Sequence, residues 1–281
     1  IARHAGVPLD LDDFDRLSRE TPLLVNSKPI GEYQMEDFFE AGAVPALMAE
    51  VRDLLDTTVV DITGEELEAQ IGQSTAMPEV IRPRATPLSP DGGIAVLRGN
   101  LAPNGAIIKH GAASPDLLEH AGPAVVFNSV EDMYRRIDDP DLEVTADSVL
   151  VLRNAGPLGG PGMPEEGFIP IPKKLLQQGV RDMVRLSDCR MSGTAFGTVV
   201  LHVSPEAAAG GPLGVVRDGD LVGLDVPARS IELLVSADEL ARRQHAGRPA
   251  DLGERRGWAR LYQQHVLQAE DGVAFDAAVR M

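Results

Sequence analysis

The chain has a single cysteine, Cys189, among its 281 residues. One cysteine excludes an internal disulfide and any metal site built from cysteines alone. A chain with so little cysteine fits a reducing compartment, and we expect a cytoplasmic protein.

Basic residues are also few, since 26 lysines and arginines face 43 acidic residues, giving a formal net charge of -17. Such a surface repels phosphate backbones, so we expect no nucleic-acid partner. The sequence has no apolar run of about 18 residues and no visible signal peptide, which predicts no membrane span. The chain opens at Ile1 rather than at a methionine, and we expect a piece of a longer protein.

The first part of the chain has helical patterns. Residues 9–20 place apolar side chains at helical spacing, and residues 35–56 indicate two helices separated by a break at 42–45. Residues 63–71 begin with Thr63 and carry Glu66 three positions later, which is typical of a helix capping box. The proline-rich stretch 77–93 then predicts a domain boundary, which we place after residue 80.

Short apolar runs dominate from residue 81 to residue 281. They predict strands at 93–99, 105–111, 123–129, 147–154, 197–204, 213–226 and 229–236. Asp218-Gly219, between two apolar runs, predicts a hairpin turn. Helices capped by serine are expected at 129–137, 204–211 and 236–240. This mixed order favours the α/β class, with a β-rich barrel or swivel-type domain rather than a doubly wound sheet.

A glycine-rich loop at 152–167, "LRNAGPLGGPGMPEEG", follows one of these strands. Glycines let backbone N–H groups approach a ligand closely, but the loop lacks the Gly-Lys-Ser/Thr ending of a nucleotide phosphate loop. Glu165 and Glu166 end it. A carboxylate here is suited to Mg²⁺, which prefers oxygen donors. Pattern alone favours a solvated acidic turn instead.

The stretch "SDCRMSGTAFG" at 187–197 holds Cys189 and Ser192. It does not match the G-x-S-x-G frame of a serine hydrolase, and a lone serine needs a metal or a base to act as a nucleophile or base. Pattern alone favours a turn serine and a buried, structural cysteine. By the same reasoning His202 is a satisfied histidine rather than a ligand, and Lys109 and His110 are exposed to solvent.

Four blocks of the sequence, taken in order, resemble the dihydroxy-acid and sugar-acid dehydratase family. They are "NSKPIGEYQMEDFFEAGAVPALM", "GIAVLRGNLAPNGAIIKHGAAS", "VLRNAGPLGGPGMPE" and "SDCRMSGTAFGTVVLHVSPEAAAGGPLGVVRDGD". The resemblance implies a hydro-lyase that converts a 2,3-dihydroxy acid to a 2-keto-3-deoxy acid. It implies an iron–sulfur cluster (2Fe-2S) and Mg²⁺ as cofactors, and a small-molecule acid as substrate.

The same resemblance implies roles for three residues. Ser192 falls on the catalytic serine, Thr194 on the neighbouring catalytic threonine, and Glu165 on a Mg²⁺-binding glutamate. Nearby cations would lower the pKa of a serine enough for it to act as a base. Glu165 and Ser192 follow two different strands, and we expect the loops after those strands to meet at one rim.

The cluster cysteines and the other Mg²⁺ ligands of the family have no counterpart here, and Cys189 does not replace them. The resemblance therefore implies a C-terminal half, inactive alone. Residues 1–80 would be the helical tail of an α/β/α cluster domain, and residues 81–281 the swivel-like barrel. It also implies a homo-oligomer when complete.

Residues 256–276, "RGWARLYQQHVLQAEDGVAFD", resemble the ending of pentonate (arabinonate or xylonate) dehydratases. Two alternatives stay open. One is the dihydroxy-acid dehydratase of branched-chain amino acid synthesis. The other is a non-catalytic swivel module that serves in binding or assembly.

Overall fold

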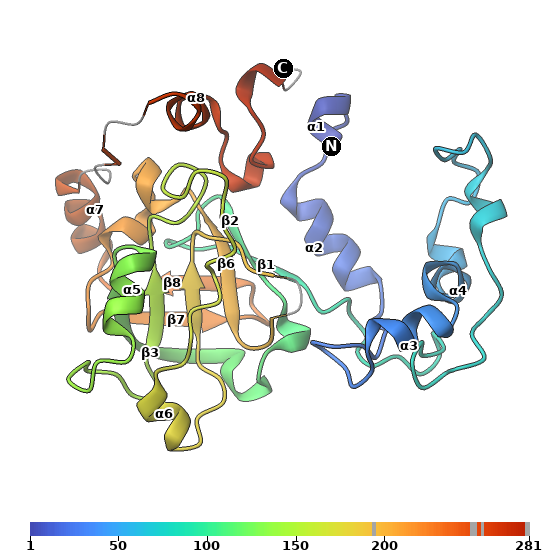
Figure 1. The fold of residues 1–281 in the computed structure, drawn as a ribbon, viewed down its shortest axis with the longest axis horizontal. Helices are drawn as coiled ribbons and strands as arrows, with labels where there is room; N and C mark the ends of the chain where they lie inside the picture. The colour runs from blue at the N-terminus through green and yellow to red at the C-terminus, as the bar shows by residue number, and fades with distance from the viewer. Residues whose placement is uncertain (193–194, 248–251, 254–255, 279–281) are drawn as a thin grey trace. The chain divides into compact units, whose positions relative to one another are not determined.

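The computed structural model describes residues 1–192, 195–247, 252–253 and 256–278. They form two compact units: one holds Asp15–Ile94, and the other holds Ile1–Phe14 together with the chain from Ala95 onward (Figure 1). The chain passes from one unit to the other after Phe14 and again after Ile94. The domain boundary predicted from the sequence, after residue 80, stays a prediction. No helix of the described residues is both long and apolar enough to cross a membrane.

The smaller unit is built around α3 (Met35–Glu40) and α4 (Ala43–Glu50). Gln34 and Asp37 cap α3 reciprocally, and Gly42, with a φ of 101°, makes the predicted break. A small apolar core holds the unit together; it comprises Phe38, Ala41, Ala46, Val80 and Ile81.

The helix predicted at 63–71 is wrong, because only a 3₁₀ turn forms there, at Leu67–Gln70. Asp61 accepts hydrogen bonds from both the backbone N–H and the hydroxyl of Thr63. Thr63 is therefore engaged in a local turn and does not cap a helix.

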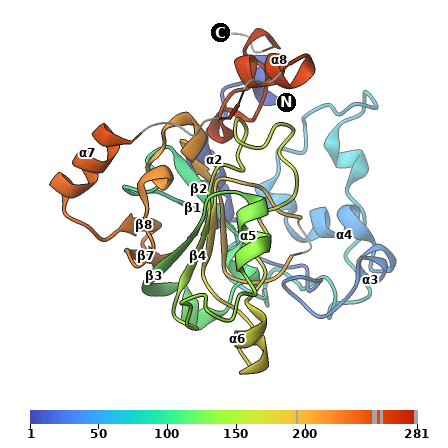
Figure 2. The same cartoon turned by 60° about the vertical axis from the view of Figure 1, so that its left-hand side comes forward.

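The larger unit contains an eight-stranded sheet in the order β1-β2-β6-β5-β4-β3-β7-β8 (Figures 1 and 2). The four central strands, from β6 to β3, run parallel, and the outer pairs are antiparallel. The strands are β1 (Ala95–Leu97), β2 (Gly105–Ile108), β3 (Glu119–Phe127), β4 (Val149–Leu152), β5 (Arg185–Ser187), β6 (Val199–Ser204), β7 (Leu221–Asp225) and β8 (Ser230–Leu233).

Helices before, between and after the strands complete this unit. They are α1 (Ala2–Ala5), α5 (Val130–Arg136), α6 (Lys173–Gln177), α7 (Ala237–Ala246) and α8 (Trp258–His265), and α2 (Leu11–Glu20) begins within it. Ser129 and Ser236 cap α5 and α7 as predicted, since each hydroxyl oxygen accepts a backbone N–H three residues on. The mixed α/β class with a β-rich barrel is confirmed.

Two details of the predicted pattern are wrong. Residues 212–215 form a 3₁₀ helix, so Asp218-Gly219 leads into β7 and the hairpin turn lies between β7 and β8 instead. The helix predicted at 204–211 is a 3₁₀ turn, Ala207–Ala209, and its N-cap is Glu206. Ser204 belongs to β6, and its hydroxyl donates to Glu270 rather than capping a helix.

Side chains alternate between two cores, as the pleat of a strand requires. On β3, Ala124 and Val126 face the core enclosed by the sheet. Val125 and Phe127 face a second core, shared with Met133 of α5 and Leu175 of α6. β4 alternates in the same way, and this double burial explains why both strands read as continuous apolar runs.

The sheet is almost closed into a barrel by a short seam between β1 and β8. Arg98 pairs with Ser230 in a parallel bridge. The side-chain amide of Asn100 then pairs with the backbone of Leu233 as a neighbouring strand would. Its nitrogen donates to the Leu233 carbonyl at 2.9 Å, and its oxygen accepts the Leu233 N–H at 2.7 Å. Between them, Gly99 has a φ of 150°, and a Cβ there would lie 2.1 Å from the carbonyl oxygen of Ile231.

We predict that Gly99→Ala lowers the free energy of unfolding by about 3 kcal/mol, because the new methyl group meets backbone that cannot move aside without opening the seam. Gly210→Ala is the matched control. Gly210 also has a positive φ, 86°, but a Cβ there meets nothing within 4 Å, so the expected cost is about 1 kcal/mol. Urea unfolding measures both; equal losses would contradict the steric role of Gly99.

Candidate functional site

The loops that carry the predicted site residues follow β4 and β5, two adjacent parallel strands. Carboxyl ends of parallel strands meet at one edge of a sheet, and ligands commonly bind there. The loop after β4 carries Glu165, and the loop after β5 carries Ser192. The topology therefore brings both loops to the same edge, as expected.

The glycine-rich loop after β4 is held by two carboxylates buried beneath it. Asp188 accepts backbone N–H groups from Asn154 at 3.1 Å and Ala155 at 3.0 Å, and also from Ala207 at 3.0 Å. Glu206 accepts the N–H groups of Leu158 at 2.8 Å and Gly159 at 3.1 Å. The loop thus has a fixed backbone, although it contains five glycines.

Two glycines of this loop are required by close approach. A Cβ at Gly156 would lie 2.7 Å from Oε2 of Glu206, and one at Gly159 would lie 2.3 Å from the carbonyl oxygen of Asn154. Gln268 completes the arrangement, since its amide donates to Glu206 at 2.8 Å and its oxygen accepts the Glu206 N–H at 2.9 Å.

Burial changes the titration of both carboxylates. It raises the pKa of Asp188 to about 6, against the lowering effect of the backbone donors. Burial also raises the pKa of Glu206, although backbone N–H groups and Gln268 oppose the change. Neither residue was singled out from the sequence. The sequence feature that could have identified them is their position, because each is an acidic residue just after an apolar strand and before a loop of small residues.

Glu165 lies at the rim of this edge, with a side chain that is 47% exposed. Its Oε1 accepts a hydrogen bond from Nη1 of Arg190 at 2.8 Å, and Nε of Arg190 donates to the Met163 carbonyl at 2.6 Å. The N–H of Gly167 donates to the Arg190 carbonyl at 2.8 Å. Arg190, which sequence reasoning missed, therefore joins the Ser192 loop to the Glu165 loop.

Ser192 lines a pocket of about 400 Å³ together with Glu165. The remaining lining is largely apolar with two arginines, and consists of Phe168, Ile171, Arg181, Arg185, Met191, Ala195 and Phe196. Thr194, the second predicted catalytic residue, lies outside the described residues. Glu165 and Ser192 thus share one cavity.

Cys189 is fully buried in the core between the sheet, α5 and α6. Its thiol lies 3.2 Å from the Pro164 carbonyl oxygen, and burial raises its pKa to about 11. A buried thiol kept protonated in this way is a poor metal ligand. Its contacts are those of a packing residue beneath the Glu165 loop.

The structure also places the other polar residues noted in the sequence, which are His202, Lys109, His110 and Glu166. His202 is on β6, and its backbone N–H donates to the Cys189 carbonyl. Burial lowers the pKa of its imidazole, and the charge of Arg190 lowers it further. Lys109, predicted to be solvent exposed, is partly buried, and burial lowers its pKa. His110, likewise predicted to be exposed, is also partly buried, at the start of a 3₁₀ turn. Glu166 accepts the hydroxyl of Tyr134 at 3.2 Å.

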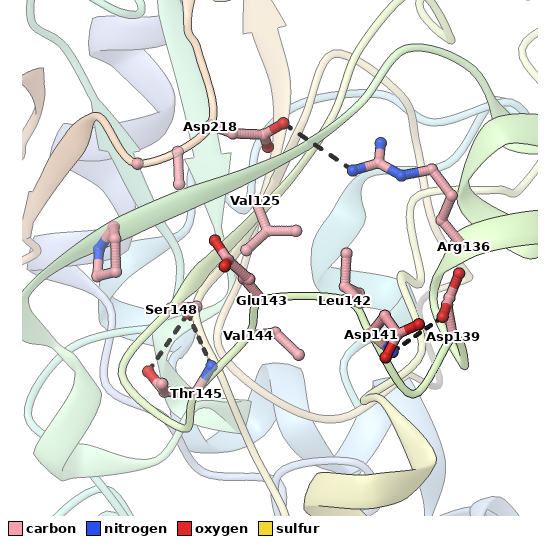
Figure 3. A pocket seen from close by; sticks show the side chains of 13 residues that line it. Val125, Arg136, Asp139, Asp141, Leu142, Glu143, Val144, Thr145, Ser148 and Asp218 are labelled. Atoms are coloured by element: carbon pink, nitrogen blue, oxygen red, sulfur yellow. Dashed lines mark hydrogen bonds and ion pairs between the residues drawn. The ribbon is translucent and has the colours of Figure 1, made fainter.

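A larger cavity, of about 780 Å³, lies near the amino end of β4 and contains none of the predicted site residues (Figure 3). Its lining is acidic, with Asp139, Asp141, Glu143 and Asp218, and Figure 3 shows Asp218 pointing toward Arg136. Within the described residues, no three His, Cys, Asp or Glu side chains are arranged to hold a metal ion.

Asp188 predicts a pH dependence of stability. Its folded pKa of about 6 lies above the ordinary value of 3.8, so the folded protein holds this proton more tightly than the unfolded chain. The stability it contributes is full below about pH 4 and is lost as the pH rises through about 6. We expect a fall of about 3 kcal/mol in the free energy of unfolding from this group.

Asp188→Asn should remove that fall, although the variant is less stable at every pH because an acceptor becomes a donor. Urea unfolding at several pH values between 4 and 7 measures the slope. The exposed Asp116→Asn is the control and should keep the slope of the unaltered protein. An unchanged slope in Asp188→Asn would show that another group is responsible.

Comparison with known proteins places these features in a family. Residues 79–273 match the model for the C-terminal domain of dihydroxy-acid/6-phosphogluconate dehydratases, and residues 1–70 match the model for their N-terminal domain.

Individual relatives are similar over almost the whole chain. The 6-deoxy-6-sulfo-D-gluconate dehydratase of Pseudomonas putida is 49% identical over 98% of this chain and 48% of its own length. The L-arabonate dehydratase of Azospirillum brasilense is 48% identical over 99% of this chain and 50% of its own length. A dihydroxy-acid dehydratase of Methanothrix thermoacetophila is 41% identical over 97% of this chain and 50% of its own length.

The chain therefore spans about half the length of the curated relatives it matches. Along this chain the match to the N-terminal domain model comes first and the match to the C-terminal domain model follows it. Both family models and the identities of these relatives agree, and the chain belongs to the dihydroxy-acid/6-phosphogluconate dehydratase family.

Proposed function

We propose that the protein carrying this chain is a hydro-lyase that removes water from a sugar acid, such as a pentonate, to give the 2-keto-3-deoxy acid. One observation carries the proposal: Glu165 and Ser192 come from loops after different strands and line a single pocket. The family's dehydratase activity and the sugar-acid relatives at 48% and 49% identity support it.

In the proposed reaction the substrate loses its C2 proton and its C3 hydroxyl, which leave together as water. The resulting enol becomes the 2-keto acid when its C2 hydroxyl loses a proton and C3 takes one up. Ser192 is the residue we assign to the C2 proton, with its Oγ as the acceptor. Phe168, Met191 and Phe196 give the pocket beside that oxygen an apolar lining.

Mg²⁺ fits this site through Glu165, because a carboxylate at an open rim is the kind of oxygen donor that the ion prefers. The ion, when bound, supplies positive charge that holds a substrate carboxylate and lowers the pKa of neighbouring hydroxyl groups. Glu165 would hold it, and the guanidinium of Arg190, 2.8 Å away, orients the carboxylate. Thr194 is proposed as a second hydroxyl beside Ser192.

An iron–sulfur cluster does not fit the described residues of this chain. Its ligands in proteins are chiefly cysteine thiolates, and the one cysteine is buried, protonated and packed against the Pro164 carbonyl. We therefore assign the chain no part in holding the 2Fe-2S cluster and propose that its ligands lie outside these residues. The chain alone is then expected to be inactive.

A dihydroxy-acid dehydratase of branched-chain amino acid synthesis is the second candidate, favoured by relatives such as the one at 41% identity. The sugar-acid relatives are more similar. A non-catalytic binding module is disfavoured, because a scaffold has no need for Glu165 and Ser192 in one pocket. We further propose that the complete protein acts in the cytoplasm, which is consistent with the single cysteine in the 281 residues of this chain, and as a homo-oligomer.

The test of the function is a comparison of pentonates with branched-chain dihydroxy acids as substrates of the complete protein, purified without oxygen. Formation of a 2-keto-3-deoxy acid from a pentonate supports the proposal. Turnover of only the branched-chain acid would support the second candidate, and turnover of neither would support the binding module.

We predict that Ser192→Ala lowers kcat for the preferred acid at least about 1,000-fold, because the base for the C2 proton is lost. Iron content should be unchanged. Ser236→Ala is the control: it removes the N-cap of α7, costs about 1 kcal/mol of stability and leaves kcat unchanged. Near-normal turnover in Ser192→Ala would remove Ser192 from the mechanism.

We predict that Glu165→Gln raises the Mg²⁺ concentration for half-maximal activity about 10-fold or more, because an anionic donor is replaced by a neutral one. The neighbouring Glu166→Gln is the matched control, since Glu166 is bound to Tyr134 instead, and it should leave the Mg²⁺ dependence unchanged. Equal shifts in the two variants would argue for general surface charge rather than a ligand.

A further inference from the structure

The short strand β5 has an arginine as its first residue, and that side chain is buried. The side chain of Arg185 is 2% exposed. Burying a charged group without a partner costs several kcal/mol, so such a residue needs both a counterion and acceptors for its N–H groups. Because a charge interrupts the apolar pattern, this strand was not among those predicted from the sequence.

Asp182 is the counterion of Arg185. Its Oδ1 lies 2.9 Å from Nη2 of the arginine, and its side chain is 4% exposed. Asp182 also accepts the backbone N–H and the hydroxyl of Thr198, at 2.9 and 2.7 Å. The carboxylate thereby connects Arg185 to the beginning of β6.

Two further hydrogen bonds of Arg185 go to the two loops of the candidate site, whereas its Nε is buried without a hydrogen-bond partner among the described residues. Nη1 donates to the Ile169 carbonyl at 3.3 Å, just after the loop that carries Glu165. Nη2 donates to the Phe196 carbonyl at 3.2 Å, at the end of the loop that carries Ser192. The ring of Phe168, whose side chain lines the shared pocket, lies 5.0 Å from the guanidinium carbon.

The guanidinium of Arg185 lies against a glycine, Gly197. Gly197 has a φ of 113°, and a Cβ there would lie 1.8 Å from Nη2 of Arg185. The glycine both turns the Ser192 loop back into β6 and vacates the space that the guanidinium fills.

We infer that Arg185 is a positioning residue for the proposed dehydration: its guanidinium bridges the loops of Glu165 and Ser192 and fixes the distance between them. The planar guanidinium of arginine can donate hydrogen bonds in several fixed directions at once. The compact ammonium group of lysine cannot reach the same set of acceptors. In this proposal Arg185 does not contact the C2 proton or the C3 hydroxyl of the substrate. It affects the reaction by holding the two loops in place. The inference rests on the proposed function for its effect on turnover.

The test is Arg185→Lys in the complete protein, with two independent readouts. Lysine keeps the charge beside Asp182 but cannot bridge both carbonyl oxygens. We expect faster hydrogen exchange at the amides of 167–169 and 195–198, a kcat about 100-fold lower because small displacements of reacting groups are costly, and a higher Mg²⁺ requirement. In Arg185→Ala, added guanidinium ion should restore part of the kcat.

Arg153→Lys is the matched control. Arg153 follows the adjacent strand β4 and donates to Asn128 and to the Gly214 and Val216 carbonyls, none of them in the two loops. It should lose stability without faster exchange in those two segments. If Arg185→Lys does not fold, Arg185→Gln with Asp182→Asn removes both buried charges together and should give the same exchange pattern.

Unchanged exchange in the two segments would overturn the inference. So would faster exchange accompanied by unchanged kcat and Mg²⁺ requirement in a protein that turns over a sugar acid. If the unaltered protein turns over no sugar acid, the proposed function fails, and the exchange result still decides whether Arg185 holds the loops.

Discussion

Backbone N–H groups at the carboxyl edge of the parallel strands need acceptors once solvent is excluded, and Asp188 and Glu206 supply them. An unpaired N–H at this depth would cost about 1–3 kcal/mol. The loop therefore has one arrangement in which its donors are satisfied, and its glycines permit that arrangement. The first part of the loop, residues 154–159, takes its position from these two carboxylates, and Arg190 holds the loop further on, at Met163 and Glu165.

Burial on both faces of the central strands explains what the sequence could predict. Val125 and Phe127 on one face of β3, and Ala124 and Val126 on the other, make an apolar run that indicates a strand without further help. The same rule fails for β5, because Arg185 is charged and its compatibility with the core depends on Asp182, three residues earlier. Partners of this kind are visible only in three dimensions.

The candidate site shows a similar division. Glu165 follows an apolar run that predicts a strand, and the family resemblance supplied the expectation that Ser192 follows a second strand, so their presence at one edge was predictable although Arg185 interrupts the apolar pattern of β5. Their common connection through Arg190 was not, because it depends on a guanidinium reaching the Met163 carbonyl and the Glu165 carboxylate at once. Capping serines at 129 and 236 were predictable, whereas Thr63 was not, since Asp61 competes for it locally.

The seam between β1 and β8 has a consequence for how the barrel moves. It is held by one parallel bridge and by the side chain of Asn100, whereas β3 and β7 are paired over five residues. The seam is therefore shorter than the pairing of β3 with β7, and we expect the barrel to open at the seam before it opens between those two strands. The parallel strands that carry the candidate site lie across the sheet from it. Opening at the seam would therefore leave the pairing of β4 with β5, beneath the candidate site, intact.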